Sequence, residues 1–184
     1  TKEGYIPASG EITSTDEVIN VTLTKEIPPQ PVEIEDVDWK NFRNSDENMA
    51  ITSVKTPTDK VAVKWSSKLG DGWGNSPSVA IIVDNNIIAM AGAKLYKLDA
   101  QTGEVLDTAE MVSTPNWGYT PPTYGNGMIF CPLNNGVVQA FDATTFESLW
   151  VFKDLKGGQA NSPITYSDGY IYTGFWTGES GEAN

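Results

Sequence analysis

Short apolar runs alternate with polar positions from residue 61 onward, and turn residues separate the runs at regular intervals. Runs of four to eight residues with this period-two alternation predict β-strands. Helix signals are nearly absent, so the pattern predicts an all-β chain. The predicted strands are 77–83, 86–91, 94–98 and 104–112, then 122–124, 128–133, 136–141 and 147–152, and finally 163–166 and 170–175.

The strands fall into a repeat, and each copy opens on a small polar residue followed by proline. The three openings are Ser76-Pro77, Thr120-Pro121 and Ser162-Pro163, at intervals of 44 and 42 residues. A period of this size with four short strands per copy is typical of a β-propeller blade. Because a propeller needs about four blades to close and the sequence holds about two and a half, we expect an incomplete propeller from a longer protein.

The segment before the repeats differs in character. Residues 18–24 alternate as a strand, and we predict that residues 1–27 are the remnant of a β-sandwich module. A proline-rich, acidic linker is predicted to follow. The predicted boundaries are 28–38 for the linker and 39–184 for the partial propeller, with an outer strand at 61–69, blades at 75–112 and 120–154, and a truncated blade at 161–184.

Charge argues against some partners. The chain carries 12 basic and 24 acidic residues, a net charge of −12 that is spread evenly along it. Without a stripe of lysine and arginine, nucleic acid and anionic lipid are poor candidate partners. No apolar run approaches the roughly 20 residues that span a bilayer, so no transmembrane segment is predicted. The chain opens on Thr1 without a recognisable signal peptide, as a processed or truncated exported protein would.

The sequence offers little for catalysis, and we predict no catalytic residue. It contains no histidine, which excludes Ser/His/Asp and Cys/His nucleophile systems. Cys131 is the only cysteine and lies in an apolar run, so a buried strand thiol is expected. An acidic cluster beside the linker is interpreted as solvated, with a weak calcium site as the alternative; no metal ligand is assigned. Its members are Glu33, Glu35, Asp36 and Asp38.

Aromatic and amide residues recur at one position of the repeat. Trp73, Trp117 and Gln159 each stand four residues before a blade-opening proline. Equivalent positions of a propeller recur around its axis, so these side chains are predicted at the mouth of the central channel, together with Asn75, Tyr119 and Asn161. Flat aromatics beside amides suit a sugar ring or an extended peptide. The alternative is that the tryptophans pack between blades or against residues 39–60; Trp176 lies in the incomplete third copy and has no assigned place.

The end of each complete copy carries a second motif. The run Ala140 to Trp150 resembles the A-x-D-x-x-T-G-K-x-x-W signature of the PQQ-type propeller repeat, found in quinoprotein alcohol dehydrogenases and in the BamB-type outer-membrane assembly lipoprotein. Leu98 to Leu106 matches the same signature. Trp39-x-x-Phe42-Arg43-Asn44 resembles the stretch before the family's first blade, so the resemblance covers about residues 39–178.

The signature has a physical explanation. Its aspartate, Asp99 or Asp142, can cap the turn between the third and fourth strands. In the first copy Thr102-Gly103 completes this turn, and the glycine supplies a positive φ. The second copy has the threonine, Thr145, at the same place. Trp65 and Trp150, two repeats apart, are the flat side chains expected to wedge between blades.

The two copies depart from the signature at one position each. Phe146 replaces the turn glycine, and Asp107 replaces the docking tryptophan of the preceding copy. We therefore expect a looser contact between the first two blades.

The resemblances also bear on function. Residues 1–27 are similar to the closing strands of carboxypeptidase-regulatory-like or PEGA-like modules of bacterial surface proteins, which implies an exported, extracellular or cell-surface location. The leading expectation is a noncatalytic recognition or scaffold region that binds a glycan or a peptide. One alternative is a self-assembly element that forms homo-oligomers through open blade edges. The other is a fragment of a quinoprotein dehydrogenase; family members hold a calcium-bound quinone, often beside a vicinal cysteine pair, and with a single cysteine we expect no cofactor here.

Overall fold

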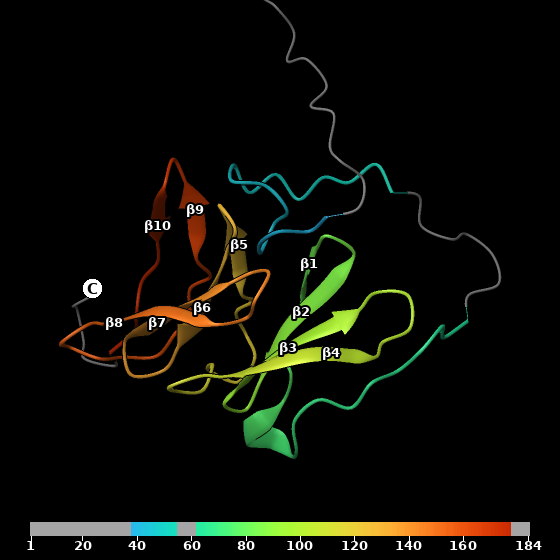
Figure 1. The fold of residues 1–184 in the computed structure, drawn as a ribbon. Coiled ribbons are helices and arrows are strands. Elements are labelled where there is room, and N and C mark those ends of the chain that lie inside the picture. The colour runs from blue at the N-terminus through green and yellow to red at the C-terminus, as the bar shows by residue number, and fades with distance from the viewer. Residues whose placement is uncertain (1–37, 55–61, 178–184) are drawn as a thin grey trace, which may run out of the picture. The chain divides into compact units, whose positions relative to one another are not determined.

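The computed structural model describes residues 38–54 and 62–177, and within them the fold is all-β (Figure 1). A 3-10 turn, Trp73–Asn75, precedes the first strand. The strands are β1 (Ile81–Val83), β2 (Asn86–Ala91), β3 (Lys94–Asp99) and β4 (Val105–Glu110) in one sheet, β5 (Thr123–Gly125), β6 (Met128–Leu133), β7 (Val137–Asp142) and β8 (Ser148–Lys153) in the next, and the hairpin β9 (Thr165–Ser167) with β10 (Tyr170–Tyr172). Each sheet is antiparallel with its strands in chain order, which confirms the predicted partial propeller of two four-stranded blades and part of a third.

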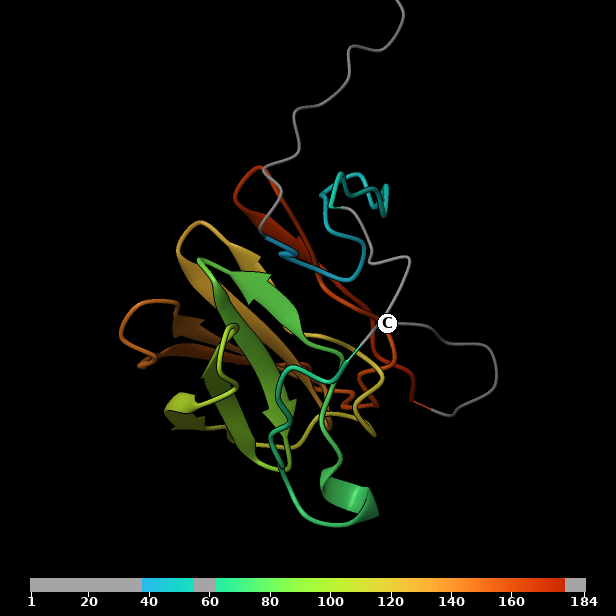
Figure 2. The same ribbon diagram turned by 90° about the vertical axis from the view of Figure 1, so that its right-hand side faces the viewer.

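The first strand of each blade lies innermost. Strand β1 contacts β5, and β5 contacts β9, so the inner strands of three blades follow one another (Figures 1 and 2). The Thr123 hydroxyl on β5 donates to the Ile164 carbonyl oxygen at 2.8 Å and links the second blade to the third. Trp39 pairs with Ile82 of β1 through two backbone hydrogen bonds of 2.8 and 2.9 Å. The stretch before the first blade therefore binds the inner edge of that blade.

The same tight turn sets the register at the inner end of every blade. Two residues with positive φ connect the first and second strands: Asp84-Asn85, Asn126-Gly127 and Asp168-Gly169. Paired positive φ values define the type I′ turn, whose twist matches that of antiparallel strands. Because register decides which side chains face the neighbouring sheet, these short dipeptides place the apolar alternation of each blade toward the core.

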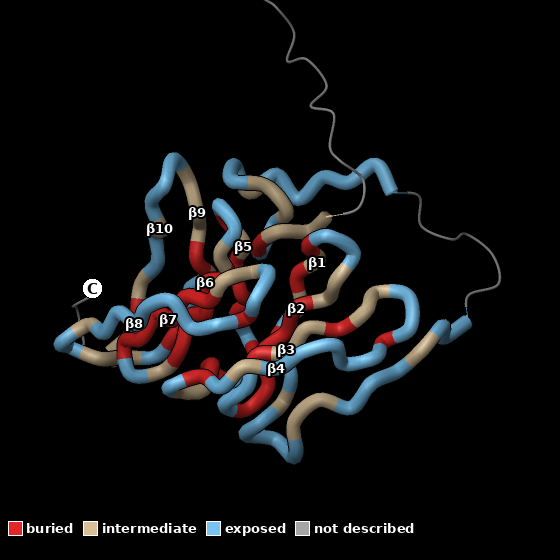
Figure 3. The backbone as a smooth tube through the Cα atoms, in the orientation of Figure 1, coloured by how far each residue is buried: buried red, intermediate tan, exposed pale blue. Residues whose placement is uncertain are grey.

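Two apolar clusters join neighbouring blades. Figure 3 shows the buried residues gathered along the strands of the first two blades. The larger joins blades one and two, where Ile88, Leu95 and Phe141 are at most 2% exposed. The smaller joins blades two and three around Phe130 and Ile164. The packing that stabilises this fold thus runs between blades, because each thin sheet has too few side chains to bury an apolar face alone.

Three strand predictions differ from the structure by three residues or more at one end or along their whole length. The last predicted strand, 170–175, covers only 170–172. The first strand of blade one covers 81–83 rather than 77–83. The Ser78 N–H still donates to the Met90 carbonyl oxygen of β2 at 2.7 Å, but the Val79 N–H donates to the Gly118 carbonyl oxygen of the next entry loop, so the regular ladder does not extend to 77. No strand forms over 62–69, the described part of the predicted outer strand. That strand was expected to pair with strands from outside this sequence. The predicted segments 1–27 and 28–37 lie outside the described residues, and the proposed domain boundaries stay predictions.

Aspartate caps shape the turn between the third and fourth strands. Asp99 Oδ1 accepts backbone N–H groups of Gln101 and Thr102 at 2.7 and 2.8 Å. Asp142 Oδ1 accepts those of Thr144 and Thr145, both at 2.8 Å. These bonds favour the charged carboxylate, so the backbone N–H of Thr102, followed by that of Gln101, lowers the pKa of Asp99 below its ordinary value. The N–H groups of Thr145 and Thr144 lower the pKa of Asp142 in the same way.

We expect these caps to make stability depend on acid pH. Each carboxyl has a lower pKa folded than unfolded, so its stabilisation is complete above the unfolded pKa, about 3.9, and is lost as the pH falls through the folded pKa. Urea midpoints of Asp99→Asn/Asp142→Asn should therefore decline less steeply below about pH 5 than those of the parent chain. Glu104→Gln/Glu147→Gln removes two carboxylates from the same turns without removing a cap; if both variants show the same pH slope, the caps are not responsible.

Trp65 docks on the capped turn of blade one. Its indole N–H donates to the Ala100 carbonyl oxygen at 3.1 Å. A Cβ built on Gly103, whose φ is 73°, would stand 2.3 Å from the indole ring, so only glycine fits both the turn and the tryptophan. Trp150, the equivalent residue of blade two, has its ring centroid 5.9 Å from that of Phe130.

The contact between blades one and two is not looser, contrary to the expectation from Asp107 and Phe146. Phe146 is 4% exposed and packs in the cluster shared by the two blades. The Lys97 ammonium lies 4.7 Å from the centroid of its ring and donates to the Thr144 carbonyl oxygen at 3.1 Å. The aromatic side chain therefore comes from the turn itself instead of from the preceding blade, and the interface is filled.

Candidate functional site

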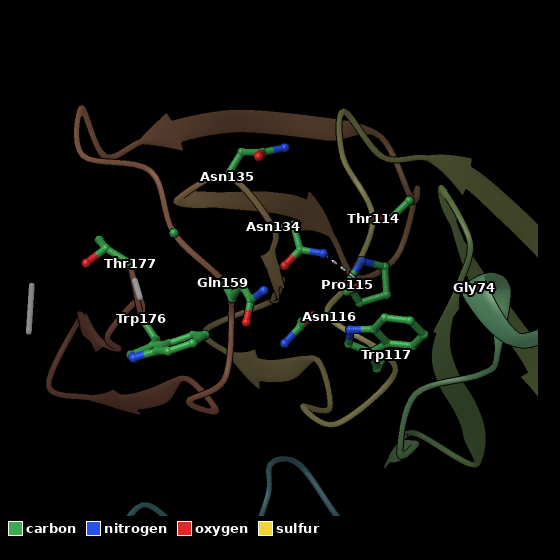
Figure 4. A pocket seen from close by; sticks show the side chains of 11 residues that line it. Gly74, Thr114, Pro115, Asn116, Trp117, Asn134, Asn135, Gln159, Trp176 and Thr177 are labelled. Carbon is green, nitrogen blue, oxygen red and sulfur yellow. Dashed lines mark hydrogen bonds between the residues drawn. The ribbon is translucent and has the colours of Figure 1, made fainter. Parts of the chain in front are cut away.

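The loops that lead into the innermost strands surround a cavity of about 520 Å³ (Figure 4). These loops precede β1, β5 and β9, so they come from three successive blades. The turn between β6 and β7 and the segment after β10 complete the wall. The lining residues are Gly74, Thr114, Pro115, Asn116, Trp117, Asn134, Asn135, Gly158, Gln159, Trp176 and Thr177.

Two of the six predicted ligand-binding residues, Trp117 and Gln159, line this cavity. Trp73 lies beside it: its ring meets that of Trp117 edge to face, with centroids 6.0 Å apart and an interplanar angle of 86°. Trp73 is 81% exposed and Trp117 50% exposed, so neither indole packs between blades. The repeat thus brings the three equivalent positions to one face.

The other three predicted residues do not line the cavity. The Asn75 side chain lies against Gly92, where a Cβ would be 3.2 Å from Asn75 Oδ1. Asn161 Oδ1 accepts a hydrogen bond from the Asn116 amide, which ties the entry loops of blades two and three together. Tyr119 is exposed beside these loops, and its backbone N–H donates to Asn116. Asn161 and Tyr119 thus belong to the frame of the cavity.

Trp176 and Asn134 belong to the cavity wall, although neither was predicted there. Trp176 exchanges backbone hydrogen bonds of 2.8 and 3.0 Å with Gln159, and this bridge holds its indole across the cavity from Trp117 (Figure 4). Asn134 lies in the turn between β6 and β7, and its side-chain amide donates to the Pro115 carbonyl oxygen at 3.4 Å. The sequence indicates only that Asn134 is a turn residue, and its contact with the entry loop at Pro115 is visible only in the structure.

The backbone holds Trp117 in an unusual conformation. Its φ of 56° lies in the left-handed region, which costs a side chain with a Cβ about 1–2 kcal/mol. Burial offsets only part of that cost, because half of the indole surface stays exposed. Gly118 follows at φ 72° and is buried against the Pro77 carbonyl group. Strained residues cluster at functional sites, so this conformation is consistent with a binding role for Trp117.

The wall is polar but uncharged. No lysine, arginine, aspartate or glutamate is among the lining residues, which offer two exposed indoles, hydroxyls and side-chain amides. Asn134 Oδ1 is buried and accepts no hydrogen bond from the described residues. Its amide NH₂ faces Pro115, so the oxygen is directed toward Gln159 (Figure 4). Such a wall can stack a flat or saturated ring and exchange hydrogen bonds with it.

The described residues do not fit a calcium-bound quinone. Cys131, the only cysteine of the sequence, is fully buried in β6 and has no vicinal partner. Burial raises the pKa of its thiol far above the ordinary value, so the group is an inert part of the core. Within residues 38–54 and 62–177, no cluster of three histidine, cysteine, aspartate or glutamate side chains could hold a metal ion. Asp38, the described member of the acidic cluster, accepts the Asp84 N–H at 3.0 Å.

Comparisons with solved structures reveal the same architecture in larger proteins. A quinohemoprotein alcohol dehydrogenase from Pseudomonas putida HK5 matches 79% of this chain with a TM-score of 0.64 and 17% identity, over 24% of its own length. A quinohemoprotein alcohol dehydrogenase from Comamonas testosteroni matches 74% of this chain with a TM-score of 0.56 and 13% identity, over 23% of its own length. A europium-containing methanol dehydrogenase matches 76% of this chain with a TM-score of 0.52 and 16% identity, over 27% of its own length. The chain thus spans about a quarter of each enzyme, and the likeness at these identities is one of fold.

Sequence comparison assigns the family. No curated protein sequence matches the chain. In the part of the chain that the structure describes, no helix is long and apolar enough to cross a membrane. A family model described as outer membrane protein assembly factor BamB matches residues 38–180, well over half of the sequence. The chain therefore belongs to this bacterial family of PQQ-type β-propeller proteins.

Proposed function

We propose that the chain is a noncatalytic recognition region of an exported bacterial surface protein, and that it binds a carbohydrate or peptide segment in the cavity between Trp117 and Trp176. The observation that carries the proposal is the pair of half-exposed indoles on opposite sides of one cavity. They are 50% and 56% exposed, and hydrogen bonds hold the backbone around both of them. Exposed aromatics on a rigid frame are typical of recognition surfaces.

The chemistry of the wall supports binding rather than catalysis. Its side chains are amides, hydroxyls and indoles, none of which is a general acid or base near neutral pH. The sequence has no histidine to supply one. A site of this composition orients a ligand through ring contacts and hydrogen bonds.

Two tryptophan substitutions test the proposal. We expect Trp117→Ala and Trp176→Ala each to weaken capture by about thirtyfold, the effect of losing about 2 kcal/mol from an aromatic contact. The probes are immobilised neutral oligosaccharides, uronic-acid oligosaccharides and proline-rich peptides, with bound chain measured by biolayer interferometry. The melting temperature should fall only moderately, because about half of each side chain is already exposed.

Tyr170→Ala serves as the matched control. Tyr170 is an exposed aromatic, 68% accessible, on β10 and outside the cavity wall. Capture that falls equally in all three variants would contradict a site at this cavity. Equal destabilisation of the two tryptophan variants, with no binding by the parent chain, would instead assign both indoles to packing.

A specific surface favours self-association as a second candidate function. Strand β8 is exposed along its whole length, and four of its six residues are large and apolar: Leu149, Trp150, Val151 and Phe152. Exposed apolar edge strands pair readily with other strands. Light scattering after size exclusion tests this candidate. The chain has a mass of 20.0 kDa, so the mass of a dimer or a higher oligomer would support self-association, and the mass of a monomer would contradict it.

A further inference from the structure

We infer that the cavity ligand is a neutral, polyhydroxylated sugar ring, held between Trp117 and Trp176 with its hydroxyls read by the Gln159 carboxamide. This inference rests on the proposed function and narrows it to one class of ligand.

The absence of charge on the wall excludes charged rings as the preferred ligand. Moving an ionised group into a cavity lined by amides and indoles carries a desolvation cost that no opposite charge offsets. The net charge of −12 further opposes anionic ligands such as uronic acids. A neutral ring meets neither obstacle.

Gln159 is positioned to bind hydroxyl groups. Its backbone N–H and carbonyl oxygen are both bonded to Trp176, at 2.8 and 3.0 Å, so the residue has a fixed place in the wall. Its side chain is exposed and lies between the two indoles (Figure 4). A carboxamide donates through its NH₂ and accepts through its oxygen, and a sugar hydroxyl can both accept and donate. The two groups therefore complement each other.

The backbone of the wall argues against an extended peptide. Peptides are commonly bound by adding a strand to a free sheet edge, which requires unpaired N–H and C=O groups. At this cavity the N–H and C=O of Gln159 already pair with Trp176. The Asn134 N–H is likewise bonded, at 2.8 Å, to the Thr114 carbonyl oxygen. These backbone groups are therefore not free to pair with a peptide, whereas the side-chain amides of the wall suit a ligand with its own hydroxyl groups.

The test is calorimetric titration of the intact chain with cellotetraose, maltotetraose and chitotetraose, alongside a uronic-acid tetramer and a proline-rich decapeptide. We expect at least one neutral oligosaccharide to bind, with an affinity that is insensitive to salt, since no charge is screened. Gln159→Leu should weaken it about tenfold, the loss of one or two hydrogen bonds. Gln159→Asn, which keeps the amide group, should weaken it less than Gln159→Leu.

The outcomes separate the two proposals. Binding of only the uronic-acid tetramer or the peptide, weakened by Trp117→Ala, would overturn the neutral-sugar inference and leave recognition at the cavity intact. Neutral sugar binding that Gln159→Leu leaves unchanged would overturn the role of the carboxamide. Binding by none of the probes would overturn both proposals.

Discussion

Replacing Phe146 by glycine should lower the free energy of unfolding by about 2–3 kcal/mol. The variant restores the turn glycine of the repeat and relieves the left-handed strain at φ 61°, worth about 1–2 kcal/mol. It also removes a side chain that is 4% exposed between two blades, and deleting a buried phenylalanine costs about 3–5 kcal/mol. The cavity outweighs the strain, so a change toward the family signature is expected to destabilise this chain. Urea unfolding followed by tryptophan fluorescence measures the effect.

A second substitution should recover part of the loss. In blade one, Trp65 packs on Gly103, and the positions equivalent to this pair in blade two are Asp107 and Phe146. Asp107→Trp alone should destabilise, because Phe146 already fills the interface. Combined with Phe146→Gly it should stabilise relative to Phe146→Gly alone, giving a coupling energy of about 1–3 kcal/mol. Effects that simply add would mean that the two aromatic arrangements do not share one space.

The regular part of the fold could be predicted because each local signal has one physical outcome. Dipeptides such as Asn126-Gly127 favour the positive φ values of the type I′ turn, and a two-residue turn fixes the register of the strands that flank it. The strand at 77–83 was predicted too long because its apolar residues continue the alternation. Val79, however, donates to Gly118 in another blade, and a contact across blades leaves no trace in local periodicity.

The candidate site was predictable only as far as the repeat reaches. Equal spacing from the blade-opening prolines places Trp73, Trp117 and Gln159 on one face, and the structure brings the last two into one cavity. The repeat carries no information about Trp176, which reaches the cavity through a backbone bridge to Gln159 outside the regular strands. Nor does a turn asparagine such as Asn134 indicate that its amide faces another loop.

The largest effect on the site from a single methyl group is expected at Gly118. A Cβ at this position would lie 2.5 Å from the Pro77 carbonyl oxygen and 3.1 Å from its carbon, at a φ of 72°. Both obstacles are backbone atoms, so the loop itself must shift. Left-handed strain of about 1–2 kcal/mol and overpacking of about 1–3 kcal/mol should together lower the free energy of unfolding of Gly118→Ala by about 3 kcal/mol. Because Trp117 precedes this glycine, ligand affinity should fall as well.

Gly127→Ala separates the clash from the strain. Gly127 has nearly the same φ, 76°, but a Cβ there would meet no atom within 4 Å, so the variant should lose only the strain, about 1–2 kcal/mol. Its turn between β5 and β6 contributes no residue to the cavity, so ligand affinity should be unchanged. Equal stability losses in the two variants would show that the entry loop yields freely to the added methyl group. In that case the backbone at Trp117 would not be rigid, and it would not hold the exposed indole in one position in the cavity.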